Sequence, residues 1–324
     1  MLKRLINRGL DFADDLCVAL GPDQPADAGT FVTVVFHKLH ERESQGRNEF
    51  APDLCVTVDV FREFVEVMLE AGYTLLSPAQ VDKGIRPGGR YLMITFDDGY
   101  FNNTLSLKVL EEFRVPATFF VSIGNVLEKK AFWWDALSRE LAQAGASGAM
   151  RKSMIERLKA LTPEKIESYL RERFGSSALV PCDDRDRPFT PGELSQFAQS
   201  PWVHFGNHTR DHAILTNCTP QQIAHQVRSC QEALAQLVGY RPIAIAYPNG
   251  NCSPAAIEAS MAAGLRLGFT VVPRRSRVSG NDESRMMLGR YLVSSERGVR
   301  EQCRKFDAKF VPSHMLKALI HSGY

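Results

Sequence analysis

The most informative part of the 324-residue sequence is Y-L-M-I-T-F-D-D-G-Y, residues 91–100. It begins with the apolar pattern of a strand and ends in two adjacent carboxylates, Asp97 and Asp98, followed by a glycine. Polar residues that follow a strand at the carboxyl rim of a parallel barrel are well placed to form a site. Because adjacent strand residues point to opposite faces, we expect the two acids to have different roles, one as a metal ligand and the other as a base.

Strand and helix patterns alternate on both sides of this stretch. Residues 31–37 (F-V-T-V-V-F-H) and 117–122 (A-T-F-F-V-S) are near-continuous apolar runs, typical of buried parallel strands. Between them, apolar residues recur at helical spacing in 61–69 and 105–113. The same alternation resumes after residue 200, with strand patterns at 202–207, 243–247, 267–272 and 286–293, and with a polar loop expected at 274–285. This order predicts an α/β fold with a parallel sheet.

Residues 125–200 interrupt the alternation with a mostly helical pattern. We expect a helical insertion that covers one end of the domain; ordinary barrel helices joined by a long loop are the alternative. Thr162 and Thr190 both resemble helix N-caps, and Thr190 has capping-box spacing to Glu193. The expected organisation is an N-terminal helix and linker at 1–30, a main domain at 31–300 and a C-terminal helical tail at 301–324.

Composition excludes several classes of protein. The net charge of +2 argues against a dedicated nucleic-acid binder, and no apolar run reaches transmembrane length. The seven cysteines are scattered and form no C-x-x-C pair, which favours free thiols in a reducing compartment. Three aspartates interrupt residues 1–20, so this segment is not typical of a signal peptide. We therefore expect a cytoplasmic protein with a docked N-terminal helix, and peripheral membrane association through that helix is the alternative.

The second informative stretch is G-N-H-T-R-D-H, residues 206–212. His208 and His212 can converge on one metal ion if the backbone there is helical or tightly turned; a surface pair without a ligand is the alternative. Like Asp98, they directly follow a strand pattern. Together these residues make a two-histidine, one-carboxylate set that suits zinc, iron or another divalent ion.

At this point the sequence resembles a known family. T-F-D-D-G at 95–99 and H-T-x-x-H at 208–212 are similar to the first two motifs of the polysaccharide deacetylase family, carbohydrate esterase family 4, which shares the NodB homology domain. Y-P-N-G at 247–250 resembles the family's aromatic-Pro-x-Gly element. The resemblance extends from about residue 31 to residue 293. It implies a distorted (β/α)7-type barrel and metal-dependent removal of an N- or O-acyl group, usually acetyl, from a sugar.

The resemblance also assigns roles. It implies that Asp97 is the general base and that Asp98, His208 and His212 bind a divalent metal ion, most simply zinc, with cobalt, nickel or iron as alternatives. Such an ion lowers the pKa of a bound water into the neutral range, and Asp97 can then take its proton. A backbone N–H beside Tyr247 or Tyr100 is expected to stabilise the oxyanion.

One part of the family pattern is missing. Many members have a late Leu-x-His element whose histidine is the general acid, but residues 287–292 read M-L-G-R-Y-L. His37, at a strand end, is our first candidate for this role or for substrate contact; protonation by Asp97 itself, and a purely structural histidine, are the alternatives. For Arg290 we consider binding of an anionic substrate group, orientation of Asp97, or a surface charge.

Three aromatic residues are candidates for substrate contact: Tyr247, Tyr100 and Trp134. Tryptophans can stack on sugar rings, although a pair such as Trp133-Trp134 more often packs within the fold. The adjacent Asp135 is expected to be a helix N-terminal acid.

The sequence as a whole predicts a metal-dependent carbohydrate N-deacetylase that acts on an N-acylated sugar or glycan precursor. A sugar N-deformylase or small-amide amidase on the same scaffold is one alternative, and a non-catalytic glycan-binding relative is another. The oligomeric state is left open.

Overall fold

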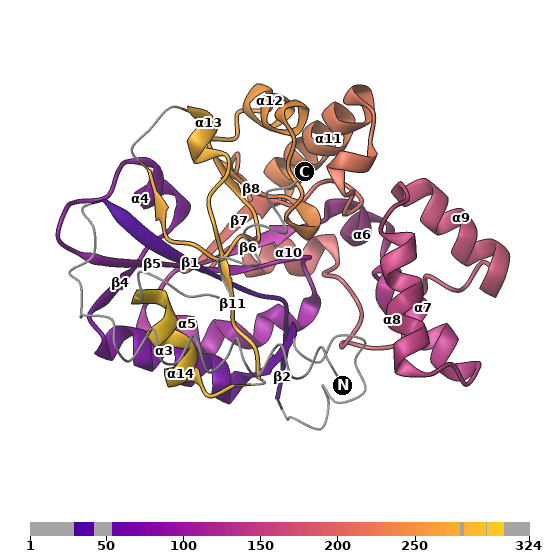
Figure 1. Cartoon of the computed structure of the whole chain (residues 1–324), viewed down its shortest axis with the longest axis horizontal. Helices are drawn as coiled ribbons and strands as arrows, with labels where there is room; N and C mark the ends of the chain where they lie inside the picture. Colours follow the sequence, from indigo (N-terminus) through magenta and orange to yellow (C-terminus); the bar gives the residue numbers. More distant parts are fainter. Residues whose placement is uncertain (1–28, 42–53, 279–281, 296, 308–324) are drawn as a thin grey trace, which may run out of the picture.

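The computed structural model describes residues 29–41, 54–278, 282–295 and 297–307. Most of the N-terminal segment expected at 1–30 and most of the tail expected at 301–324 lie outside these ranges. The described part is an α/β structure in which one curled sheet is surrounded by helices (Figure 1). None of the described helices combines the length and the apolar character needed to cross a membrane.

Six parallel strands form the centre of the sheet, in the order β1-β5-β6-β7-β8-β9. Residue pairing keeps their carboxyl ends level, because Phe36 pairs with Phe96, and Phe96 with Phe119. The residues that follow these strands therefore meet at one rim. The strands are β1 (Thr30–Phe36), β5 (Arg90–Phe96), β6 (Ala117–Val121), β7 (Val203–Asn207), β8 (Ala244–Ala246) and β9 (Leu267–Phe269), with β4 (Tyr73–Leu75) beside β5.

Residues 288–293 join the two edges of the curled sheet. On one side Leu288 N donates to Gly268 O of β9 at 2.7 Å, and on the other Val293 N donates to Val35 O of β1 at 3.3 Å. Only Tyr291–Leu292 in this segment form a strand, β11, so the strand expected at 286–293 is much shorter than predicted. The loop expected at 274–285 is also wrong in part, since it contains β10 (Ser276–Arg277), antiparallel to β1, and the short helix α13 (Asp282–Arg285).

A row of phenylalanine rings fills the core between the sheet and the helices of one face. Phe36 stacks on Phe96 with ring centroids 5.3 Å apart, and Phe96 stacks on Phe119 at 4.9 Å. Phe61 and Phe64 cover them from α3 (Val58–Glu70), whose apolar residues recur at helical spacing. The other helices around the sheet are α4 (Pro78–Asp82), α5 (Leu107–Phe113), α10 (Pro191–Phe197), α11 (Pro220–Val238), α12 (Pro254–Ala262) and α14 (Val299–Asp307).

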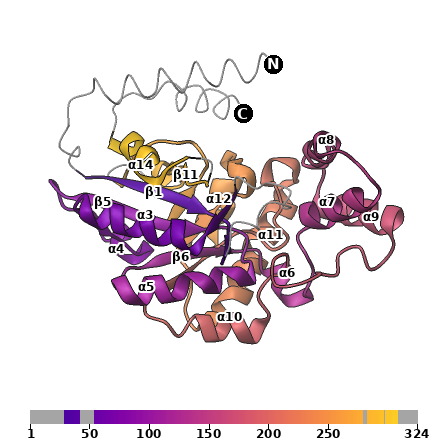
Figure 2. The same cartoon turned by 90° about the horizontal axis from the view of Figure 1, so that it is seen from below.

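Between β6 and β7 the chain forms a helical region that lies at one end of the molecule (Figures 1 and 2). After α6 (Ile123–Glu128) come α7 (Trp133–Gln143), α8 (Gly148–Leu158) and α9 (Pro163–Phe174), which bury a small hydrophobic cluster of their own. Thr162 precedes α9 without a side-chain cap, whereas Thr190 and Glu193 form the expected capping box at the start of α10. The domain boundaries, including an insertion at 125–200, remain a prediction.

Candidate active site

The rim of the sheet brings together Asp98, His208 and His212. Asp98 follows β5, and the two histidines follow β7. Asp98 Oδ1 lies 3.4 Å from His208 Nε2 and 3.2 Å from His212 Nε2. One potential ligand atom from each residue lies within 4.8 Å of the others. Three side chains from segments more than a hundred residues apart therefore converge on one point.

Left-handed backbone conformations create this convergence. Among the described residues, six that are not glycine have positive φ, and Asp98 (76°), Thr209 (62°), His212 (50°) and Asn249 (57°) are four of them. The two histidines are thus brought together by a tight turn and not by a helix. A positive φ is unusual for a β-branched residue such as Thr209, and backbone strain of this kind concentrates at functional sites.

The helix α11 holds the histidine turn in place through one side chain. Gln226 Oε1 accepts a hydrogen bond from Asp211 N at 2.9 Å, and Gln226 Nε2 donates to Asp211 Oδ2 at 2.8 Å. Gln226 O also accepts from Arg210 N at 2.9 Å. Sequence reasoning missed Gln226 because nothing in a helical glutamine indicates a partner on a distant loop.

The donor set fits a cation. His208 Nδ1 lies 2.7 Å from Ala246 O, and because a carbonyl oxygen only accepts, Nδ1 carries the proton. A neutral His208 then presents the lone pair of Nε2 towards Asp98 Oδ1, so two acceptors face one another. That arrangement requires either a second proton on the ring or a cation between the two atoms. A backbone carbonyl that fixes the tautomer in this way is typical of metal-binding histidines.

Asp97 lies beside this cluster and is held by Arg290. The guanidinium forms two parallel bonds, Nη1 to Oδ1 at 2.6 Å and Nη2 to Oδ2 at 2.7 Å, while its Nε donates to Thr270 O at 3.0 Å. Burial alone would raise the pKa of Asp97, but the charge of Arg290, with that of His208, holds the pKa below its ordinary value. Arg290 is only 1% exposed, so of the expected roles the structure favours orientation of Asp97 and argues against direct binding of substrate.

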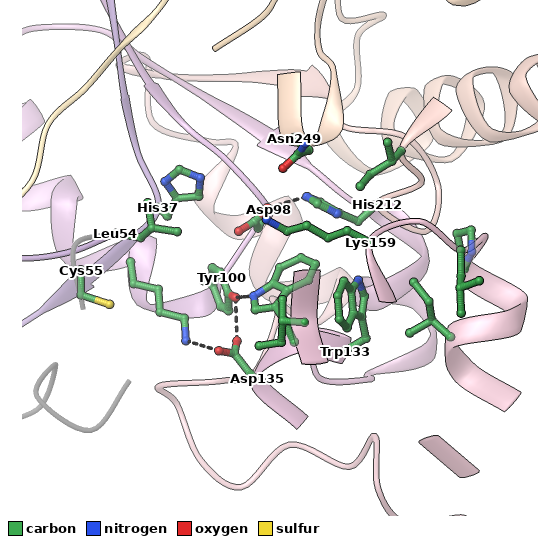
Figure 3. A pocket seen from close by; sticks show the side chains of 17 residues that line it. His37, Leu54, Cys55, Asp98, Tyr100, Trp133, Asp135, Lys159, His212 and Asn249 are labelled. Carbon is green, nitrogen blue, oxygen red and sulfur yellow. Dashed lines mark hydrogen bonds and ion pairs between the residues drawn. The ribbon is translucent and has the colours of Figure 1, made fainter. Parts of the chain in front are cut away.

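A cavity of about 160 Å³ opens onto the cluster (Figure 3). Asp98 and His212 form part of its wall, and Figure 3 shows His37 and His212 on opposite sides of Asp98. The Nδ1 atom of His37 is buried and has no hydrogen-bond partner among the described residues. Further residues that line the cavity are Lys38, Tyr100, Trp133, Trp134, Asp135 and Asn249.

The floor of the cavity contains a hydrogen-bonded network that the sequence did not reveal. The Asp135 carboxylate accepts a hydrogen bond from Lys38 Nζ at 3.0 Å and another from the Tyr100 hydroxyl at 2.7 Å. Trp134 Nε1 donates to the same hydroxyl at 2.9 Å, and its ring lies 4.5 Å from that of His212. Burial, reinforced by the charge of Asp135, raises the pKa of Tyr100 well above its ordinary value, so the phenol stays protonated. Asp135 is in the first turn of α7 as expected, but it is also a buried ion-pair partner.

Tyr247 does not reach this cavity. Its side chain is fully buried in a hydrophobic cluster with Leu215 and Ile257, and its N–H donates to Phe269 O at 3.0 Å. The buried side chain gives no support to the expected substrate contact of Tyr247, which remains a prediction. Tyr100 and Trp134, in contrast, line the cavity.

Comparisons with known proteins identify the family. A model described as polysaccharide deacetylase matches residues 84–268, more than half of the chain. The chain belongs to the polysaccharide deacetylase family. Its match to the curated protein "Putative polysaccharide deacetylase YxkH" of Bacillus subtilis (strain 168) is 22% identical over 239 residues, which cover 72% of this chain and 64% of that protein. The chain thus spans less than two thirds of this relative's length.

Solved structures of deacetylases share the fold. The Streptococcus pyogenes deacetylase PplD, determined with acetate, aligns with a TM-score of 0.60 at 16% identity, over 86% of this chain and 99% of that one. IcaB from Ammonifex degensii aligns with a TM-score of 0.58 at 16% identity, over 86% and 98%. The expected fold class, a distorted barrel of parallel strands with surrounding helices, is therefore confirmed.

Proposed function

We propose that this polysaccharide deacetylase is a metal-dependent hydrolase that removes an N-acetyl group, or a similar acyl group, from a sugar or glycan precursor. The observation that carries the proposal is the convergence of Asp98, His208 and His212 beside the buried pair of Asp97 and Arg290. Asp98 and His212 line a cavity of about 160 Å³ at the rim of the sheet, and Asp97 is the neighbour of Asp98 in the chain.

Asp98, His208 and His212 would hold the ion. Two imidazole nitrogens and one carboxylate oxygen suit zinc best, with cobalt, nickel or iron as alternatives. When bound, a divalent ion of this kind activates water for attack and polarises an acyl carbonyl.

Asp97 would act as the general base. The pKa of its carboxyl is held below the ordinary value by Arg290, so Asp97 is ionised at neutral pH and can accept a proton from the attacking water. The bidentate contact with Arg290 leaves the carboxylate one orientation, which keeps the accepting oxygen in place.

The leaving amine needs a proton when the C–N bond breaks, and we assign this step to His37. It lines the same cavity as Asp98, and its buried Nδ1 has no partner within the described residues. The products are then the free acid and the amine of the sugar. Return of the proton from Asp97 is the alternative and requires no further residue.

We also propose a reducing compartment, the cytoplasm. The six cysteines that the structure describes are all free thiols, and such cysteines are typical of proteins kept reduced.

The decisive experiment measures acetate release from N-acetylated sugars by protein treated with chelator and then supplied with zinc, cobalt, nickel or iron. We expect release only after metal is restored. Asp97→Asn should retain the metal and lose activity, whereas His208→Ala should lose both, as shown by metal analysis of the purified variants. Release of formate from N-formyl sugars without release of acetate would instead identify a deformylase. Full activity in the absence of metal, or in Asp97→Asn, would contradict the proposal.

A further inference from the structure

The cavity continues from the metal-binding residues to the helical region, and its lining changes along the way. At the rim it is formed by Asp98 and His212. Elsewhere it is formed by aliphatic side chains: Ile155, Leu161, Pro163 and Ile166 from α8, α9 and their connection, and Ile214 from the segment that follows His212. We call these five residues the aliphatic wall.

Two indole rings connect the rim with the helical part of the aliphatic wall, since Trp133 and Trp134 pack against the cluster that contains Ile155 and Ile166. The Trp134 ring centroid lies 4.5 Å from that of His212, and the Trp133 centroid lies 5.5 Å from that of Trp134. Figure 3 shows Trp133 beyond Tyr100, on the side away from His37. The order along the cavity is thus carboxylate and imidazole, then indole, then aliphatic carbon.

The aliphatic wall is unsuited to further sugar units. None of its five side chains carries a hydrogen-bonding group, and Lys159, the charged residue beside them, donates to Glu156 at 3.0 Å. A sugar ring placed there would leave its hydroxyls buried without hydrogen-bond partners, which weakens binding. An alkyl chain has no such groups and gains free energy from burial.

We infer that the substrate is a glycolipid: an N-acylated sugar whose aglycone is an alkyl chain, and the aliphatic wall binds the first carbons of that chain. The inference rests on the proposed function, since it places the acyl amide at Asp98 and His212. The sugar ring then lies against the indoles, and the alkyl aglycone reaches the wall. A long N-acyl chain would not account for the indoles that lie between the rim and the wall.

The test compares two series of substrates. In the first, an N-acetylated sugar carries an O-alkyl aglycone of one to eight carbons; in the second, the methyl glycoside carries N-acyl chains of two to eight carbons. We expect kcat/KM in the first series to rise about fourfold for each methylene until the wall is covered, and the second series to show no such rise. A rise in the second series alone would overturn the inference and assign the wall to the acyl group, and no rise in either would overturn it outright.

A matched pair of variants tests whether the aliphatic wall causes the rise in kcat/KM with alkyl length. Leu161→Gln places an amide in the half-buried part of the wall, whereas Met150→Gln makes a comparable change at a side chain of α8 that is 57% exposed. We expect the octyl-to-methyl ratio of kcat/KM to fall at least about tenfold in Leu161→Gln and to keep its wild-type value in Met150→Gln. An unchanged ratio in Leu161→Gln would contradict the assignment.

The inference can be tested even if no substrate is hydrolysed, an outcome that would count against the proposed function alone. Calorimetry with Asp97→Asn protein then compares binding of the octyl and methyl glycosides. Tighter binding of the octyl compound, lost in a Leu161→Gln double variant, supports the glycolipid assignment. Equal affinities overturn it.

Discussion

The rim of the sheet and the helical region α7–α9 form opposite ends of one cavity, and they are built in different ways. At the rim, Asp97, Asp98 and His208 follow strands whose register is fixed by backbone hydrogen bonds, and all three are almost fully buried. In the helical region, Trp133 begins α7 and Leu161 lies between α8 and α9. These helices pack mainly on one another, and both side chains remain partly exposed. A sheet can hold reacting groups rigidly while a helical cluster beside it is free to vary in sequence. We therefore expect the rim to determine the reaction and the helical region to determine the substrate.

The largest expected effect is at the rim. Replacing Arg290 by Met leaves the Asp97 carboxylate buried without its cation, which should lower the free energy of unfolding by about 3–5 kcal/mol. Urea denaturation measures this loss, and the double variant Arg290→Met/Asp97→Asn should recover part of it because the buried charge is gone. A single variant as stable as the wild type would show that the rim is less rigid than we describe.

The next prediction tests whether His37 donates a proton or only positions other groups. His37→Ala should lower kcat/KM for an N-acetylated sugar by about a hundredfold, because the amine leaves poorly without a proton. An aryl acetate, whose leaving group needs no proton, should be hydrolysed almost as fast as by the wild type. Equal losses on the two substrates would instead indicate that His37 only positions other groups.

The ion pair between Lys38 and Asp135 connects the two regions, since Lys38 begins the short strand β2 (Lys38–His40), which comes after β1, and Asp135 belongs to α7. Lys38→Met should lower the free energy of unfolding by about 2 kcal/mol, less than the loss at Arg290, because Asp135 keeps its hydrogen bond from Tyr100. Thermal denaturation, with Lys38→Met/Asp135→Asn as the compensating control, measures the difference. If the single variant lost no stability, the helical region would be independent of the rim.

The smallest effect lies within the helical region. Ser147 caps α8 by accepting a hydrogen bond from Met150 N at 3.3 Å, and Ser147→Ala should lower the free energy of unfolding by about 0.5–1 kcal/mol. Activity on a methyl glycoside should stay at the wild-type level. If Ser147→Ala lost activity under conditions in which the variant is still folded, the helical region would also influence the reaction, and the two regions would not have separate roles.

The same contrast explains how far the sequence could predict the structure. The strands and the residues that follow them could be identified, because buried parallel strands give apolar runs and the polar residues after them stand out. Because Asp98, His208 and His212 all follow predicted parallel strands, their convergence at one rim could be predicted from the sequence. The turn at His208 to His212 was left open, because left-handed conformations of Thr209 and His212 have no signal in residue type.

Contacts between distant segments could not be predicted from local sequence patterns. Lys38 and Asp135 are 97 positions apart, and nothing in either segment indicates the other. Tyr247 was assigned to the substrate because its motif suggested a site, but a pattern of alternating faces does not say which face of the sheet is covered. For Arg290, orientation of Asp97 was one of three interpretations, and only the geometry distinguished them.

The segment 288–293 that joins the edges of the sheet has a consequence for the synthesis of this protein. Asp97 and Arg290 are 193 positions apart, so the ribosome must complete most of the chain before the two can meet. A nascent chain that already contains Asp97, Asp98 and both histidines still has an unpaired carboxylate and an open sheet edge. Closing so long a loop is entropically costly and slow compared with local folding. We expect the proposed activity to appear in a late step, when residues 288–293 pair with both edges of the sheet, so that incomplete chains released from the ribosome would not hydrolyse substrate.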